Sequence, residues 1–407
     1  MITTINNKHN KLNVPNLRFP EFQGEWEEKR LSEIADLFKG NGISKDQLSD
    51  DGEPCILYGE LYTKYKSETI REVISKTNID NTKLVRSKAN DVIIPCSGET
   101  AEDIATARCV LNGNILLGGD LNIIRLHGYD GAFMSYQLNG RRKYDIAKVA
   151  QGVSVVHLYG EHLKGVKTIN PCLEEQKKIA KLLSLLDERI ATQNKIIEDL
   201  KKLKSAIIEN VFDDKHSERL QLDNVGSYIR GLTYSSNDVV EHGGTLVMRS
   251  NNIVNGSLLD YNNNVVFVNK QMSAEQQLQN GDIVICMANG SSSLVGKSSF
   301  YDGNWHSSIT VGAFCGIYRS KEPIVKWLFQ TNKYRRYIWN SLQGGNGAIA
   351  NLNGEDILNM SFSIPSAPIK DTCVKMLTSV DSALENNISL CALYTLQKQY
   401  LLRQMFI

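Results

Sequence analysis

Two short motifs in the sequence have the residue types of a methyl-transfer site. The segment Phe38-Lys39-Gly40-Asn41-Gly42 fits the FxGxG pattern of a loop that holds S-adenosylmethionine. The segment Asn170-Pro171-Cys172-Leu173 is close to the NPP-aromatic motif with which adenine methyltransferases hold a flipped base. The pair suggests a DNA adenine methyltransferase that acts on its own.

Three observations argue against this interpretation. The NPP motif needs an aromatic ring to stack on the flipped base, and Leu173 stands at that position. A related segment, Ile229-Arg230-Gly231-Leu232, lacks the second glycine, and a lone GxG is weak support. Pro171 already has a matched residue, Pro365, at a second strand-to-helix junction. We therefore predict no catalytic residue and no cofactor in this chain, and retain the methyltransferase as the alternative.

The composition excludes several other classes of protein. With 407 residues, 42% of them hydrophobic, the chain is long enough for two or three globular domains. It has no membrane-length apolar run and no signal-peptide pattern at its start, so we expect a cytoplasmic protein without membrane contact. Its eight cysteines include no CxxC pair, which predicts no metal site. The net charge of +1 leaves DNA binding open, because a basic surface can be local.

The second half of the chain repeats the first. From Leu158 and Leu352 onward the two copies match without a gap, at a constant offset of 194 residues. Asp187 returns in this way as Asp381. Earlier parts match more loosely: ILYGELY from Ile56 parallels VMRSNNI from Val247, and NDVIIPCSGET from Asn90 parallels GDIVICMANGSSS from Gly281. Each half therefore has a divergent front and a better-matched rear.

The fronts are predicted to be rich in short strands. Short apolar runs bounded by turn-forming residues indicate strands at Asp91–Pro95, Ile115–Leu117, Val265–Val268 and Asp282–Ile285. Two helices are expected, at Phe133–Ala150 and Ile324–Leu342.

The rears are predicted to be long helices. After Pro171 a helical pattern without internal glycine or proline runs to Phe212. Apolar residues spaced alternately by four and three fall at Ile179, Leu183, Leu186, Ile190, Ile197, Leu200, Ile207 and Val211. The second copy carries Cys373, Leu377, Val380, Leu384, Cys391, Tyr394, Leu401 and Met405. Both stripes are typical of a coiled coil.

Polar residues interrupt both stripes at matching places and favour an antiparallel pair. These residues are Gln193 and Lys204 in the first copy, and Asn387 and Lys398 in the second. An antiparallel pair lets Gln193 face Asn387 and keeps the lysines apart, whereas a parallel pair would bring the lysines together. Two unrelated amphipathic helices, packed on separate domains, remain the alternative.

These features resemble the specificity subunits of Type I restriction–modification enzymes. The resemblance rests on a strand that ends in proline, a Glu-Gln segment and a long helix with an early aspartate. They are found here as Ile169-Asn-Pro171, Leu173-Glu-Glu-Gln176 and Leu186-Asp187. The second copy keeps Ile364-Pro365 and Asp381, with Lys370-Asp371 in place of the Glu-Gln pair. The segments Pro15–Pro20 and Trp26–Leu31 also look familial.

The resemblance implies an α+β fold with two pseudo-repeated, β-rich target-recognition domains, separated by two long helices that form an antiparallel coiled coil. The domains would span residues 1–172 and 215–366, and the helices residues 173–214 and 367–407. Such a subunit reads a split target in double-stranded DNA. It docks two modification subunits, which use S-adenosylmethionine, and two motor-nuclease subunits, which use ATP and Mg²⁺. A coiled-coil scaffold without a nucleic-acid role is a third possibility.

Side chains that read DNA are expected on loops held by strands, where arginine, asparagine and hydroxyl groups reach base edges. The first loop pair offers Tyr58, Tyr62, Lys64, Tyr65 and Lys66, and Arg249, Ser250, Asn251 and Asn252. The second offers Ser97, Glu99 and Thr100, and Asn289, Ser291, Ser292, Ser293 and Lys297. Lys39 and Arg230 are expected at phosphates, with Arg108 and His306 nearby. The basic runs Arg141–Lys143 and Lys333–Arg336 fit either a DNA-lining or a solvated helix face.

Overall fold

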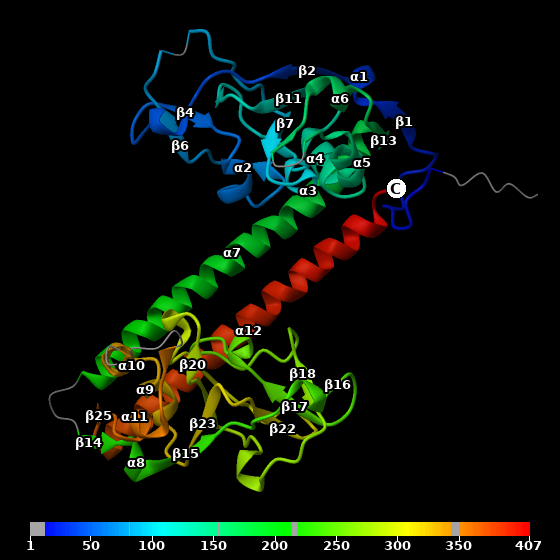
Figure 1. Cartoon of the computed structure of the whole chain (residues 1–407). Helices are drawn as coiled ribbons and strands as arrows, with labels where there is room; N and C mark the ends of the chain where they lie inside the picture. The colour runs from blue at the N-terminus through cyan, green and yellow to red at the C-terminus, as the bar shows by residue number, and fades with distance from the viewer. Residues whose placement is uncertain (1–12, 81, 153–154, 214–217, 343–349) are drawn as a thin grey trace, which may run out of the picture. The chain divides into compact units, whose positions relative to one another are not determined.

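The chain forms two compact units, and each unit contains part of both long helices (Figure 1). The computed structural model describes residues 13–80, 82–152, 155–213, 218–342 and 350–407. Unit 1 combines the chain up to Lys195 with Ile388–Ile407, and unit 2 is Ile196–Asn387. The four-segment division made from the sequence, which cuts at the helix ends, stays a prediction.

Two sheets form the β-rich part of unit 1. The larger has the strand order β2-β11-β7-β9-β5, with bounds Ala35–Lys39, Leu121–Leu126, Asp91–Pro95, Arg108–Val110 and Thr69–Ile70. The smaller has the order β10-β4-β6-β3, with bounds Leu116–Leu117, Glu53–Ile56, Ser75–Thr77 and Leu48–Ser49. Two short ladders pair β1 (Glu27–Arg30) with β13 (Lys167–Asn170), and β8 (Ser97–Gly98) with β12 (Val156–His157). Short helices α1, α2, α3 and α6 lie at Leu31–Ile34, Glu60–Thr63, Ala101–Ile104 and Gly160–Lys164.

The sheets of unit 2 repeat this topology. One has the order β15-β23-β19-β21, with bounds Gly226–Arg230, Cys315–Ser320, Ile283–Cys286 and Ser298–Phe300. The other has the order β16-β18-β17-β22, with bounds Val239–Val240, Val266–Val268, Thr245–Met248 and Ile309–Val311. The ladders pair β14 (Glu218–Gln221) with β25 (Ser361–Ile364), and β20 (Ala288–Asn289) with β24 (Ala350–Asn351). Helices α8 and α11 lie at Leu222–Val225 and Gly354–Leu358. The internal repeat therefore extends through the divergent fronts.

One ion pair recurs in both larger sheets. In unit 1, Arg125 binds Asp91 at 2.7 Å, and in unit 2, Arg319 binds Asp282 at 2.6 Å. Each buried carboxylate also accepts the backbone N–H of the residue three positions earlier. The aspartate thereby closes the turn into the central strand, and buried carboxylates persist only when they are satisfied in this way. This contact explains why aspartate survives in otherwise divergent sequence.

The two helices expected in the fronts are each broken in two. The first is α4 (Gly131–Asn139) and α5 (Lys143–Val149), because Gly140 ends α4 and its N–H bonds to the carbonyl of Tyr136. The second is α9 (Val325–Leu328) and α10 (Asn332–Leu342). There the Thr331 hydroxyl donates to the Leu328 carbonyl and accepts the N–H of Tyr334, which starts a new helix. The expectation of single helices was wrong at both places.

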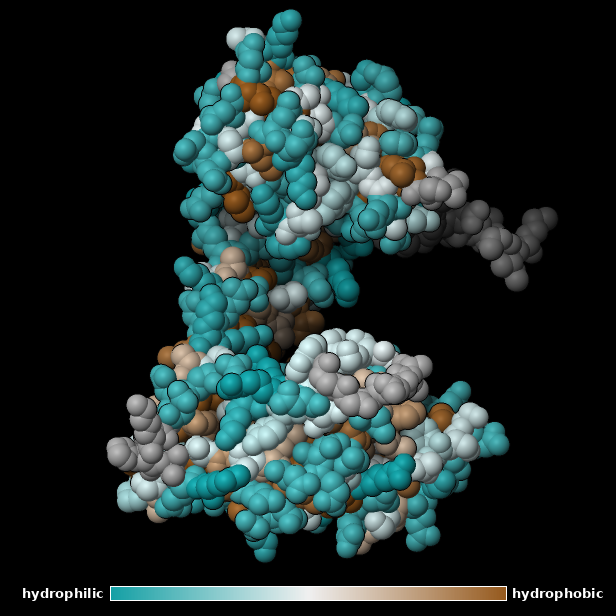
Figure 2. Space-filling view, turned by 60° about the vertical axis from the view of Figure 1, so that its left-hand side comes forward, coloured by the Kyte–Doolittle hydropathy of each residue, from teal (hydrophilic) through white to brown (hydrophobic). Residues whose placement is uncertain are grey.

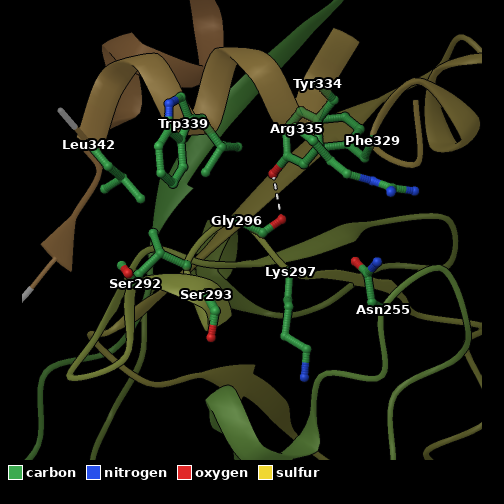
Figure 3. Close-up of a pocket in the computed structure, with 12 residues that line it drawn as sticks. Asn255, Ser292, Ser293, Gly296, Lys297, Phe329, Tyr334, Arg335, Trp339 and Leu342 are labelled. Carbon is green, nitrogen blue, oxygen red and sulfur yellow. Dashed lines mark hydrogen bonds between the residues drawn. The ribbon is translucent and has the colours of Figure 1, made fainter. Parts of the chain in front are cut away.

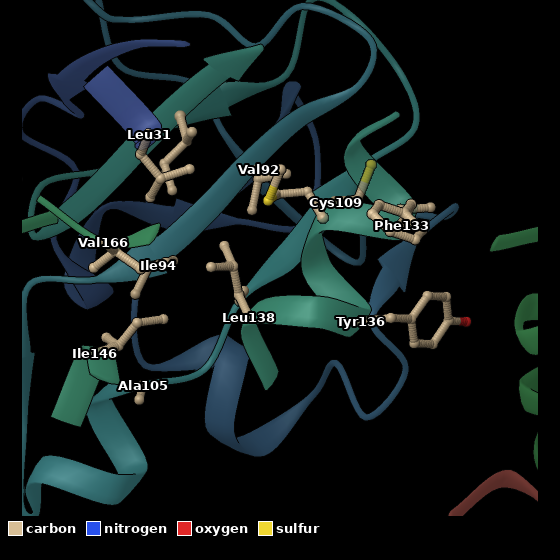
Figure 4. Packing of buried hydrophobic residues seen from close by; sticks show 14 of the residues in the cluster. Leu31, Val92, Ile94, Ala105, Cys109, Phe133, Tyr136, Leu138, Ile146 and Val166 are labelled. Atoms are coloured by element: carbon tan, nitrogen blue, oxygen red, sulfur yellow. The ribbon is translucent and has the colours of Figure 1, made fainter. Parts of the chain in front are cut away.

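A large hydrophobic cluster joins the sheet of unit 1 to the long helices. Figure 4 shows Val92 and Ile94 of β7 facing Phe133 and Leu138 of α4. Residues of both long helices belong to the same cluster. The phenol of Tyr136, at one edge, points away from the cluster (Figure 4). Helix α4 is thus the layer between the sheet and the long helices.

The long helices are α7 (Leu173–Phe212) and α12 (Ala367–Gln404), and they pair antiparallel within each unit. In unit 1 the beginning of α7, at Ile179 and Leu183, shares a core with Met405, beyond the end of α12. In unit 2 the end of α7, at Ile208, shares a core with Leu377 near the beginning of α12. The antiparallel arrangement is therefore confirmed. Whether Gln193 faces Asn387 stays a prediction, because these residues belong to different units.

The start of α7 is held by the Glu-Gln segment. Glu175 accepts two hydrogen bonds from the Arg18 guanidinium, at 2.8 and 2.7 Å. Gln176 donates to the Pro171 carbonyl and accepts the N–H of Asp130, the residue just before α4. The second copy replaces the amide contact with an ion pair of 3.1 Å between Lys370 and Glu322. Despite its weaker motif, the second copy therefore still connects the start of its long helix, α12, to the loop that precedes helix α9.

The lysine that interrupts the apolar stripe of α12, Lys398, is largely buried in an ion-pair cluster in unit 1. The Lys398 ammonium lies 2.5 Å from Asp187 on α7 and 2.6 Å from Glu68. Asp187 also accepts a hydrogen bond of 2.6 Å from the Tyr136 hydroxyl. Burial disfavours the charged ammonium, but the two carboxylates outweigh it and raise the pKa of Lys398. Both long helices and helix α4, which covers the sheet, thus meet at Asp187.

Unit 2 contains the same cluster with the helices exchanged. Lys204 on α7 lies 2.7 Å from Asp381 on α12. Asp381 also binds Lys326 at 2.8 Å and accepts a hydrogen bond of 3.0 Å from the Trp327 indole. Burial lowers the pKa of Lys204, against the attraction of Asp381. The lysines therefore lie in different units, as an antiparallel pair requires, and each pairs with the aspartate of the other helix.

The two clusters differ in charge, which predicts unequal effects of the matched substitutions. Lys398→Met should destabilise unit 1 by about 3–5 kcal/mol, because it removes the nearest cation from two largely buried carboxylates, Asp187 and Glu68. Lys204→Met should cost less, because Asp381 keeps Lys326. Urea denaturation of both variants measures the difference. Lys202→Ala, on an exposed lysine of α7, is the control and should change stability by under about 0.5 kcal/mol. Equal losses from the two methionine variants would contradict this account.

Candidate nucleic-acid interface

The first glycine of the FxGxG-like motif, Gly40, has a structural role. A Cβ atom on Gly40 would lie 2.1 Å from the Gly118 carbonyl oxygen. In unit 2, a Cβ on Gly231 would lie 2.2 Å from the Gly312 oxygen. Only glycine permits this approach of the backbone after β2 and β15 to the neighbouring turn. The first glycine of the motif is therefore explained by packing in both units, as Gly40 and as Gly231.

The Asn-Pro motif is also built into the fold. Asn170 is buried at the end of β13, and its amide donates to the Thr168 hydroxyl at 2.8 Å. The Pro171 carbonyl accepts the hydrogen bond from Gln176. These contacts use the motif as a junction between β13 and α7.

Six of the predicted reading residues of unit 1 line one pocket of about 740 Å³; they are Tyr58, Tyr62, Lys66, Ser97, Glu99 and Arg108. The Tyr62 hydroxyl donates to the Ser97 carbonyl at 3.0 Å, and Lys66 donates to the Tyr62 carbonyl at 2.7 Å. Burial raises the pKa of Tyr62, so its hydroxyl stays protonated. The structure thus brings the two predicted loops of unit 1 together. Asp103 also lines this pocket, which therefore holds charges of both signs.

Other residues of unit 1 that were predicted to read DNA form hydrogen bonds or ion pairs within the protein. Arg108 is buried, and its guanidinium donates to the carbonyls of Tyr65 and Ala107. Lys64 binds Glu60 and lies outside this pocket, in a neighbouring one. Thr100 caps α3 through the N–H of Asp103, and the exposed Lys39 pairs with Asp120 at 3.2 Å.

In unit 2 the loop after β17 is held by Asn252, which is fully buried. Its amide donates to the carbonyls of Asp260 and Asn263, and its oxygen accepts the N–H of Arg249. The Arg249 guanidinium donates to the Asn264 carbonyl at 2.9 Å. Glu60 performs the same backbone capping in unit 1, through the N–H of Leu57. The equivalent of Arg249 is therefore Leu57, one residue from the pairing inferred from the sequence.

The predicted polar loops of unit 2 also lie together. The Asn289 amide reaches the Ser250 hydroxyl at 3.4 Å, and the Asn289 oxygen accepts the N–H of Ser291. Ser292 and Lys297 line a pocket of about 240 Å³. The remaining predicted residues of this unit, Arg230, Asn251 and His306, are exposed and outside that pocket.

Sequence reasoning missed several residues of unit 2 that share these surfaces. Arg335 and Trp339 of α10 line the 240 Å³ pocket with Ser293 (Figure 3). Arg335 falls within the basic run whose role the sequence left open. The exposed Phe314 precedes β23, and its carbonyl accepts the N–H of Ala288, next to Asn289. The other basic run is structural in part, because Arg141 donates to the carbonyls of Arg403 and Phe406 at the end of α12.

The described residues also bear on metal and membrane binding. Among them, no group of three or more histidine, cysteine, aspartate or glutamate side chains is placed to hold a metal ion. No helix within the described part of the chain combines the length and apolarity needed to cross a bilayer.

Comparisons with known proteins agree with this architecture. Residues 23–202 match the model of the Type I restriction modification DNA specificity domain. The chain is 28% identical over 197 residues to the Type I restriction enzyme MjaVIII specificity subunit of Methanocaldococcus jannaschii, covering 48% of this chain and 43% of that protein. It is 34% identical over 153 residues to the EcoKI specificity subunit of Escherichia coli K12, covering 36% and 31%. The matches thus span less than half of these relatives.

A solved structure resembles the chain over nearly its whole length. The crystal structure of the Type I restriction–modification system S subunit from M. genitalium covers 97% of this chain and 99% of its own, with a TM-score of 0.67 and 16% sequence identity. At this identity the likeness concerns the fold. Residues 23–202 are thus similar to a Type I restriction modification DNA specificity domain, and the chain shares the fold of a Type I restriction–modification S subunit.

Proposed function

We propose that this chain reads a split target in double-stranded DNA, with each unit recognising one half. The observation that carries the proposal is the recurrence of one sheet topology in both units, with different polar side chains on equivalent loops. In unit 1 these loops bring two tyrosines together with charges of both signs, whereas in unit 2 they bring Asn289 together with the hydroxyl of Ser250. Two similar frames with different reading groups suit an asymmetric target.

We further propose that two modification subunits dock on the long helices and recognition domains. S-adenosylmethionine would bind in those subunits, and ATP and Mg²⁺ in two further motor-nuclease subunits. Support comes from apolar residues on the outer face of α12 in unit 1, where Leu393, Leu396 and Tyr400 are 61, 60 and 58% exposed. Their spacing of three and four puts them on one helix face. Hydrophobic side chains are also visible on the surface of the helical segment in Figure 2.

The first test exchanges one recognition front. Replacing residues 1–170 with the corresponding region of a relative should change one half of the methylated target and leave the other half unchanged. The exchange keeps Pro171, all of α7 and the Asp187–Lys398 ion pair, so this contact between the two long helices survives. Methylation mapping in cells that also supply the modification subunits measures the outcome. The reciprocal exchange of residues 215–366 is the control and should change the opposite half; simultaneous change of both halves would refute independent reading.

The second test lengthens both long helices. We expect seven residues inserted after Lys195 and seven inserted after Asn387 to widen the gap between half-sites. Each insertion adds about 10 Å, or about three base pairs at ~3.4 Å each. A heptad turns the stripe by only about 20°, and both buried ion pairs lie outside the inserted segments. Methylation mapping should show the longer gap with unchanged half-sites. An unchanged gap would exclude the helices as the spacer.

The third test concerns docking. Leu396→Asp should weaken binding of the modification subunit about tenfold, because it places a charge in a desolvated contact. Gln397→Asp, at the neighbouring exposed position, is the matched control and should have little effect. Sedimentation of the mixed subunits reports the affinity. Equal binding by both variants would show that this face of α12 is not part of the interface.

A further inference from the structure

Two pockets of unit 2 form a continuous groove. The first, of about 240 Å³, lies between α10 and the loop from Ser292 to Lys297 (Figure 3). The second, of about 270 Å³, lies beside α7 and is lined by Lys201, Lys204 and Ser205. Asn255 and Arg335 line both pockets. We call the two together the α10 groove. It does not coincide with the loop contact between Ser250 and Asn289.

The groove is cationic throughout. Lys201 lies along one pocket, Lys297 along the other, and Arg335 where they join. None of the described residues that line either pocket is acidic. Lys204 also faces the groove, but its charge is compensated by Asp381. The pocket of unit 1 differs because two carboxylates line it.

The walls of the groove are fixed by internal contacts. The Tyr334 hydroxyl of α10 donates to the Gly296 carbonyl at 2.8 Å (Figure 3). Ile338 packs so tightly there that a Cβ on Gly296 would lie 2.7 Å from it. On the other side, Lys204 donates to the Gly256 carbonyl at 2.8 Å, and Asn255 accepts the N–H of Ser298. The cations are therefore presented on a preorganised frame, which limits the entropy lost on binding.

We propose that the α10 groove binds the sugar–phosphate backbone of double-stranded DNA. This inference rests on the proposed function and adds a contact surface to it. The cations are spread along two joined pockets and do not converge on one point, which suits an extended polyanion better than a single small anion. Each pocket is also smaller than the roughly 300 Å³ at which organic-ligand sites begin. Serine hydroxyls and lysine ammonium groups are common phosphate contacts and carry no base preference.

The proposal gives a long helix a direct role in DNA binding. Lys201 belongs to α7, whereas Arg335 and Lys297 belong to the recognition domain. A backbone that occupies the groove contacts both parts of unit 2. The phosphates would then set the position of the domain on the duplex, leaving the Ser250 and Asn289 loops to read bases.

The test measures the salt dependence of binding by the full chain. The probe is a fluorescent duplex of about 30 base pairs and arbitrary sequence, titrated between about 50 and 200 mM salt. Lys201→Ala, Lys297→Ala and Arg335→Ala are combined in one variant. Loss of three phosphate contacts should flatten the slope of log K against log salt by about 2.7 and weaken binding to every duplex tested. Over this salt range the change in affinity should shrink by about 40-fold.

The control removes the same charge elsewhere in unit 2. Lys202→Ala, Lys321→Ala and Arg336→Ala are combined, since these exposed cations line neither pocket. This control should keep the wild-type slope, and thermal melting checks that both variants fold. A groove variant with the wild-type slope would overturn the groove and leave the proposed function standing. Equal loss in both variants, or loss on one sequence only, would also overturn it. A wild-type chain that binds no duplex would overturn both proposals.

Discussion

A lysine that is buried or nearly so on each long helix binds a carboxylate on the other helix, and this requirement governs how the two helices meet. Lys398 pairs with Asp187, and Lys204 pairs with Asp381. An unpaired buried charge costs several kcal/mol, whereas apolar side chains slide past one another at little cost. A shift by one helical turn, about 5.4 Å, would break both pairs at once. The apolar stripe therefore holds the two helices together, and the ion pairs fix their alignment along the helix axis.

The same aspartates fix the sheets to the helices. Asp187 accepts the Tyr136 hydroxyl and Asp381 accepts the Trp327 indole, both from the short helix that covers the sheet. Different aromatic residues thus perform one task at equivalent places, which is how fronts of different sequence attach to similar rears. The sheet is in turn braced at its central strand by ion pairs such as Asp91–Arg125. The loops that carry the candidate reading groups are therefore held on a stiff frame.

The sequence predicted the features that depend on periodicity. The two long helices, their antiparallel pairing and the repeat follow from apolar spacing and a constant offset. It did not predict that Lys204 is paired, because a lysine in a stripe looks like an interruption until its partner on another segment is known. The helix breaks at Gly140 and Thr331 were missed because a single glycine or threonine within a helical stretch does not by itself end a helix. At the candidate site, Arg335 lay in an ambiguous basic run, since spacing along one helix does not say which loop it faces.

The exchange of partners between the helices has an evolutionary consequence. Each ion pair combines an aspartate of one repeat with a lysine of the other. The charged side chains of each copy therefore find their partners in the other copy. A substitution at Asp187 therefore removes a partner of Lys398, which lies in the other copy. Gene conversion that overwrites one helical segment with the other preserves both pairs, whereas independent drift of the copies breaks them. The two helices must therefore keep the aspartate and lysine positions matched, while the rest of each segment can change.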